Sequence, residues 1–112
     1  MHILAAMVSC FEKVKPDPGV IKYFAIALSL KEAIKSSKKG LDDKTEDLLA
    51  CARKTIDNIQ EYKFFGSEDL EKFYNKWTPR KMYALSDEIE SGRLTNAEKD
   101  VNYMLRFLRE KL

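Results

Sequence analysis

Side chains that perform acid–base or nucleophilic chemistry are scarce in this chain. Its only histidine, His2, stands at the N-terminus, where side chains are poorly held. Nucleophilic catalysis by serine or cysteine needs a neighbouring base, and histidine is the usual one. Paired carboxylates such as Asp42-Asp43 and Glu68-Asp69 fall in the first turns of expected helices, where the helix dipole favours negative charge. The sequence therefore predicts a protein that is not an enzyme and has no catalytic residues.

Metal and cofactor ligands form no pattern either. A structural zinc site needs about four close-set Cys, His or carboxylate ligands, whereas Cys10 and Cys51 lie 41 positions apart. The four glycines stand at positions 19, 40, 66 and 92, too widely separated for a phosphate-binding loop. We expect no metal and no cofactor, and we interpret both cysteines as free thiols because a chain of this size needs no disulfide to fold.

One segment has a composition of its own. Residues 62–83 contain seven of the twelve aromatic side chains, and no acid stands between positions 72 and 86 to offset the basic residues there. Tryptophan, tyrosine and arginine are frequent in protein-binding hot spots. Rings interleaved with cations can also stack on unpaired nucleobases while they contact phosphates. The candidate partner-binding residues are Lys72, Lys76, Trp77, Arg80, Lys81 and Tyr83.

The same segment also has the spacing of a buried helix face. Four apolar side chains recur at positions i, i+3, i+4 and i+7: Leu70, Phe73, Tyr74 and Trp77. Charged side chains such as Arg80 and Lys81 should stay at the surface, because burying an unpaired charge is costly. The sequence leaves open whether the aromatic side chains of residues 62–83 belong to the core or to a binding surface.

The elements that must position these residues are helices. No window alternates with period two and no Asn-Gly or Asp-Gly hairpin signal occurs, so strands are not expected. Apolar stripes of helical spacing predict helices over residues 1–15, 18–39, 43–64, 68–77, 79–90 and 95–112. Two cap-and-proline pairs mark helix starts, Asp17-Pro18 and Thr78-Pro79. Thr95 and Glu98 have the spacing of a T-x-x-E capping box for the last helix.

The fold class expected is all-α: a small helical bundle of four main helices, with a short helix pair inserted before the last helix. The 112 residues suit a single helical domain, 1–112, and their 45% apolar and 34% charged content is ordinary for a globular protein. Between Val20 and Leu30 the only charge is Lys22. A helix that is apolar on nearly every side should be the central one.

The first residues raise the question of targeting. Met1 to Phe11 is apolar, but it lacks a basic N-terminal region and is about half the length of a membrane span. We therefore expect a cytoplasmic protein without a membrane partner. A short first helix that is apolar around most of its circumference favours a homodimer, which would cover both of its sides.

The function expected from the sequence is protein–protein binding by a non-enzymatic helical protein, such as an inhibitor, an immunity protein, an adaptor or a structural subunit. The alternative is a nucleic-acid-associated helical subunit that uses the basic and aromatic segment 72–83. The net charge of only +2 lacks the strongly basic character of most nucleic-acid-binding domains. The salt dependence of binding distinguishes the two functions. Binding to phosphates weakens steeply as the salt concentration rises, whereas binding through an apolar interface is nearly insensitive to salt.

Overall fold

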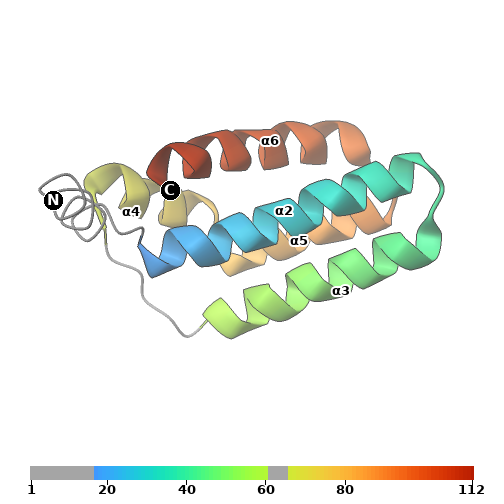
Figure 1. Ribbon diagram of the computed structural model, residues 1–112, viewed down its shortest axis with the longest axis horizontal. Coiled ribbons are helices and arrows are strands. Elements are labelled where there is room, and N and C mark those ends of the chain that lie inside the picture. The colour runs from blue at the N-terminus through green and yellow to red at the C-terminus, as the bar shows by residue number, and fades with distance from the viewer. Residues whose placement is uncertain (1–16, 61–65) are drawn as a thin grey trace, which may run out of the picture.

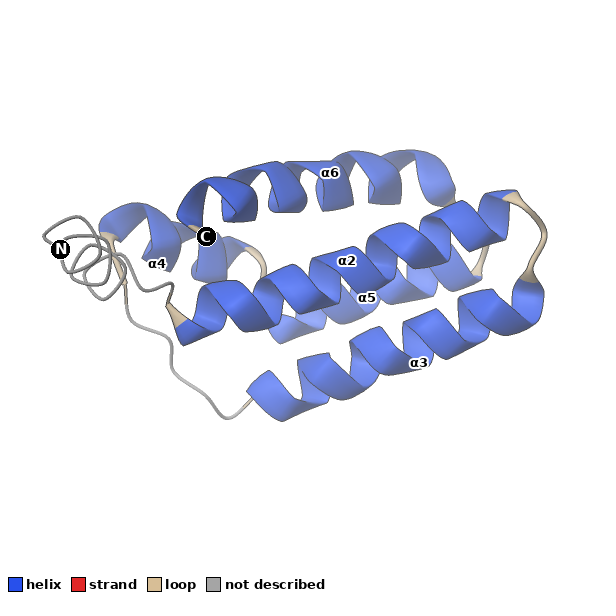
Figure 2. Ribbon diagram, viewed as in Figure 1, coloured by secondary structure: helices blue, strands red, loops and turns tan. Residues whose placement is uncertain are grey.

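The computed structural model describes residues 17–60 and 66–112, and within these two stretches every regular element is an α-helix. The all-α class is confirmed, and Figure 2 shows no strand in the described residues. Figure 1 shows the helices in order: α2 (Pro18–Lys38), α3 (Asp42–Ile59), α4 (Glu68–Lys76), α5 (Pro79–Glu90) and α6 (Leu94–Lys111). The helix expected over residues 1–15 lies outside the described residues, so the homodimer inferred from it stays a prediction.

Four helices pack as an antiparallel bundle. α2 contacts α3 and α6, and α5 contacts the same two helices from the other side. The chain direction alternates from α2 to α3, α5 and α6 (Figure 1). This is the up-down-up-down arrangement that short connections between helices favour.

The place of α5 differs from the sequence-based expectation. The sequence grouped residues 79–90 with residues 68–77 as a short pair inserted before the last helix. The structure makes α5 one of the four bundle helices, because its apolar stripe of Met82, Leu85 and Ile89 is buried in the common core. The short helix α4, with nine residues, lies at the end of the bundle where α2 begins and α6 finishes (Figure 1).

Helix α2 is the central element, as its composition predicts. It contacts three of the other helices, α3, α5 and α6. Its buried side chains are fully or almost fully enclosed: Val20, Tyr23, Ile26, Ala27, Leu30, Ala33 and Ile34. At its far end the buried hydroxyls of Ser36 and Thr45 lie 2.7 Å apart and share a hydrogen bond, which joins α2 to α3 beside their connecting turn.

Both predicted cap-and-proline starts are confirmed. The Gly19 amide donates to Asp17 Oδ1 at 2.7 Å, and the Lys81 amide donates to Thr78 Oγ1 at 3.3 Å. Each bond satisfies a backbone donor that the first helical turn leaves open. Helices α2 and α5 therefore begin at the prolines that the sequence predicts as their first residues.

The capping box predicted at Thr95 is wrong. Helix α6 begins at Leu94, with Arg93 as its N-cap and no side-chain cap bond. Gly92 adopts a left-handed φ of 81°, and the Arg93 amide donates to the Glu88 carbonyl at 2.9 Å. This Schellman motif turns the chain so tightly that the next helix starts before Thr95 is reached.

Two further findings bear on location and on thiol chemistry. None of the described helices is long and apolar enough to cross a membrane.

Cys51 lies exposed on α3 as a free thiol, and Cys10 is outside the described residues. Reaction of Cys51 with a labelling reagent therefore needs no unfolding.

Candidate functional site

The aromatic segment supplies the core at one end of the bundle. Leu70, Phe73, Tyr74 and Trp77 are all less than 10% exposed. The stacked rings of Phe73 and Phe107 join α4 to α6, with centroids 4.6 Å apart and planes 6° from parallel. Stacked and edge-on ring pairs each add about 0.5–1.5 kcal/mol beyond the area they bury. Three of the seven aromatic residues in segment 62–83, Tyr62, Phe64 and Phe65, lie outside the described part of the chain.

Tyr23 of α2 holds this aromatic end together. Its ring lies 5.7 Å from Phe73 and 5.0 Å from Tyr74, measured between centroids. Its hydroxyl donates to the Trp77 carbonyl at 2.9 Å, and the Tyr74 hydroxyl donates to Asp17 Oδ1 at 3.1 Å. Burial raises the pKa of Tyr23 to about 12. Burial, and then the Asp17 carboxylate, raise the pKa of Tyr74 well above its ordinary value.

We expect the domain to lose stability between about pH 10 and pH 12. An unfolded tyrosine titrates near pH 10, whereas folding favours the protonated phenol of Tyr23 up to about pH 12. The stabilisation from this group is therefore complete below pH 10 and is lost as the pH rises through its folded pKa. Urea unfolding at a series of pH values measures the loss. Tyr23→Phe should be less stable at pH 9 and should show a shallower loss above pH 10; an equally steep loss would contradict this assignment.

Trp77 is in the core, which is one of the two places that the sequence left open for it. The backbone amide of Trp77 donates to the Phe73 carbonyl at 2.9 Å, so the helical path continues and its indole follows the buried face of α4. Trp77 is 6% exposed, and its indole Nε1–H is buried with no hydrogen-bond acceptor among the described residues. Lys76 Nζ lies 5.5 Å from the Trp77 ring and 4.9 Å from the Tyr103 ring. The cation therefore covers the edge of the aromatic core.

The remaining candidate cations lie at the surface. Lys72 and Glu68 form an ion pair at 3.3 Å in which both side chains are largely exposed, and such a pair contributes little stability. Arg80 and Lys81 occupy the first turn of α5, are exposed, and form no ion pair with any described residue. They are the positive charges in this segment that remain free to meet a partner.

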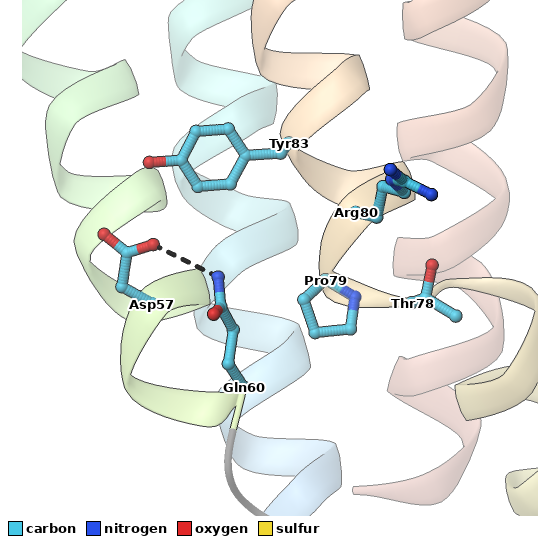
Figure 3. A pocket seen from close by; sticks show the side chains of 6 residues that line it. All are labelled: Asp57, Gln60, Thr78, Pro79, Arg80 and Tyr83. Atoms are coloured by element: carbon cyan, nitrogen blue, oxygen red, sulfur yellow. Dashed lines mark hydrogen bonds between the residues drawn. The ribbon is translucent and has the colours of Figure 1, made fainter.

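Arg80 and Tyr83 line an open pocket between the end of α3 and the start of α5. The pocket has a volume of about 660 Å³, and Figure 3 shows the Tyr83 hydroxyl on the side of Asp57 and Gln60. We call it the α3/α5 pocket; its lining residues are Asp57, Gln60, Thr78, Pro79, Arg80 and Tyr83. The structure thus brings two of the six candidate residues, Arg80 and Tyr83, to one pocket. Lys81 follows Arg80 on α5, Lys72 and Lys76 lie on α4, and Trp77 is in the core.

Arg53 of α3 supports the ring of Tyr83 from the neighbouring helix. Its guanidinium lies 5.8 Å from the ring centroid and donates to Asp87 and to Glu90, each at 2.7 Å. Burial acts to lower the pKa of Arg53, but the hydrogen bonds to the two carboxylates outweigh it and raise that pKa. Sequence reasoning missed Arg53, although the acids at positions 87 and 90 share one face of α5. The network fixes α3 against α5 and so fixes the wall of the α3/α5 pocket.

The α3/α5 pocket is lined by polar groups and one aromatic ring. It offers one carboxylate, one amide, one guanidinium and one phenol, with no histidine or thiol among its lining residues. Within residues 17–60 and 66–112 no group of three or more His, Cys, Asp or Glu side chains could hold a metal ion. The groups present can donate and accept hydrogen bonds and offer a ring surface to an incoming group.

The fold and the site define an all-α antiparallel bundle with an open polar and aromatic pocket at one end. No family model, no curated protein and no solved structure matches this chain.

Proposed function

We propose that this protein acts by binding another protein, and that the α3/α5 pocket and the adjoining first turn of α5 form the binding surface. The contrast between two arginines carries the proposal. Arg53 is held by two carboxylates at 2.7 Å, whereas Arg80, on the opposing helix, has no ion-pair partner within the described residues. Arginine and tyrosine are both enriched in protein-binding hot spots, and here Arg80 and Tyr83 line one pocket.

The partner that fits this surface carries a carboxylate opposite Arg80. A guanidinium can donate two parallel hydrogen bonds to one carboxylate, and such bidentate pairs fix geometry as well as adding binding free energy. Lys81 adds a second positive charge, while Asp57 and Gln60 offer acceptors on the opposite wall of the pocket. The surface is mixed in charge, which suits a protein more than a uniformly anionic polymer.

The burial of the aromatic rings favours a protein partner over a nucleic acid. Stacking on nucleobases needs exposed ring faces, and Phe73, Tyr74 and Trp77 are each less than 10% exposed. Of the basic residues in segment 72–83, Lys72 is paired with Glu68 and Lys76 covers the Trp77 ring. This leaves too few free cations for a strong phosphate-binding surface.

The double charge reversal Arg80→Glu with Lys81→Glu tests the proposal. Both side chains are exposed, so the melting curve should change little, while affinity for the partner should fall at least about tenfold. The partner is captured from the native host on immobilised protein, with nuclease treatment, and its affinity for each variant is then measured by titration.

The matched control is Lys39→Glu with Lys44→Glu, the same change of charge at the far end of the bundle. Lys39 and Lys44 are exposed and form no ion pair with described residues. This control should retain the partner. Loss of the captured partner on nuclease treatment, or equal binding by the two double variants, would contradict the proposed function.

A further inference from the structure

Helices α2 and α6, which contribute nothing to the α3/α5 pocket, form a groove of their own. The groove has a volume of about 550 Å³ and includes Leu28 and Leu105 among its lining side chains. Antiparallel contacts run along it, from the Lys38–Glu98 ion pair at 2.5 Å to the Lys31–Asn102 hydrogen bond at 2.7 Å. We call this the α2/α6 groove.

An apolar stripe on α2 continues the groove. Ile21 is 53% exposed and Leu28 is 39% exposed. They stand at positions i and i+7 of one helix and therefore share a face, with the exposed Ala25 between them. Ile21 and Leu28 therefore give this side of α2 a narrow apolar stripe that a partner could cover.

The charge beside this stripe is net positive. The α2/α6 groove is lined by four cations and two carboxylates. One of those carboxylates, Glu32, lies 3.5 Å from Lys35. Lys31 bonds the neutral amide of Asn102. Arg106 and Arg109 are exposed and form no ion pair with any described residue.

We propose that the α2/α6 groove binds an acidic amphipathic helix of another protein. Aliphatic side chains on one face of that helix would cover Ile21 and Leu28, and Asp or Glu side chains beside them would contact Arg106 and Arg109. Helices of this kind commonly bind in apolar grooves through anchors spaced at i, i+3 or i+4, and i+7. The interface is separate from the α3/α5 pocket, and the inference does not rest on the function proposed for that pocket.

The same charges argue against two other ligands for the α2/α6 groove, a second copy of the chain and a membrane surface. A second copy of the chain would place four cations and two carboxylates against an identical set, so the net interaction would be repulsive. An anionic membrane would repel Glu32 and Glu110 at the groove, and two aliphatic side chains provide little apolar area to insert. An acidic helix neutralises the arginines and covers the stripe together.

A displayed library of 16-residue helical peptides, selected against the full chain, tests the proposal. The enriched peptides should be net negative and carry aliphatic residues at helical spacing. A fluorescein-labelled enriched peptide should bind at least about tenfold more weakly to the Arg106→Glu, Arg109→Glu variant. Exchanging its acids for lysine should weaken binding by a similar factor. The Arg80→Glu, Lys81→Glu variant is the matched control and should bind this peptide normally, which separates the result from the function proposed above.

Several outcomes would overturn the proposal. One is a pool of selected peptides that is neutral or basic. Another is unchanged peptide binding by the Arg106→Glu, Arg109→Glu variant when that variant melts normally. A dimer in sedimentation that Leu28→Glu dissociates would assign the groove to a second copy. Binding to phosphatidylglycerol vesicles without peptide selectivity would assign it to a membrane. Broadening of the Leu28 amide signal by a nitroxide on Cys10, with Cys51→Ser, would assign it to the first residues of the chain itself.

Discussion

Trp77→Ala is expected to lower the free energy of unfolding by about 3 to 5 kcal/mol, the usual cost of removing a large buried aromatic side chain. The indole is 6% exposed, and the Tyr23 hydroxyl donates to the backbone carbonyl of the same residue. A cavity at this point would loosen both the end of α4 and its contact with α2. Because domains of this size are stable by only about 5–15 kcal/mol, a large part of the stability depends on one side chain. Trp77 is the only tryptophan, so urea unfolding must be followed by circular dichroism.

The matched variant is Trp77→Phe. It keeps most of the apolar ring and removes the buried Nε1–H that has no acceptor in the described structure. An unsatisfied buried donor itself costs about 1 to 3 kcal/mol, so Trp77→Phe should lose far less stability than Trp77→Ala. A Trp77→Ala protein that is fully stable but has lost its partner would return Trp77 to the binding surface and overturn the core assignment.

Leu30→Ala is expected to cost about 2 to 5 kcal/mol, whereas Leu28→Ala on the same helix should cost less than about 1 kcal/mol. Leu30 is 0% exposed and Leu28 is 39% exposed. The two residues are of one type and two positions apart on one helix, so the difference in helix propensity between Leu and Ala cancels in the comparison. Urea unfolding of both variants measures the difference, which reports burial alone.

The Leu28 variant also tests the α2/α6 groove. A folded Leu28→Ala protein should bind the selected acidic peptide several-fold more weakly, since it has lost one of two aliphatic contacts. Equal destabilisation by Leu28→Ala and Leu30→Ala would show that Leu28 is covered in solution. That result would contradict a free apolar stripe on α2.

The candidate site was only partly accessible from the sequence. Composition alone singled out segment 72–83 and placed Arg80 and Lys81 at the surface, because unpaired charges stay in water. The pairing of Arg53 with Asp87 and Glu90 needed the structure, since these residues come from different helices. The pocket wall formed by Asp57 and Gln60 also required α3 to be placed against α5.

The sequence by itself determined what depends on neighbours three or four residues away. It placed the helix starts at Asp17-Pro18 and Thr78-Pro79, because caps and first-turn prolines act within one turn. It also predicted the all-α class and the central place of α2, because an apolar stripe of helical period must be buried against another element. Where two local signals competed, as at Gly92 and Thr95, the tighter turn came first along the chain and set the helix start.

Tertiary structure decided which sides of the helices stay uncovered. Helix α2 is apolar on nearly every side, so its periodicity gives no outward direction. Its neighbours α3, α5 and α6 cover most of its circumference and leave the side of Ile21 and Leu28 open. In the same way the spacing of Phe73 and Trp77 fits a core or a surface equally well, and the presence of Tyr23 and Phe107 opposite them makes it a core. Local pattern defines a helix face, but only the number and position of packed neighbours decide whether that face is buried.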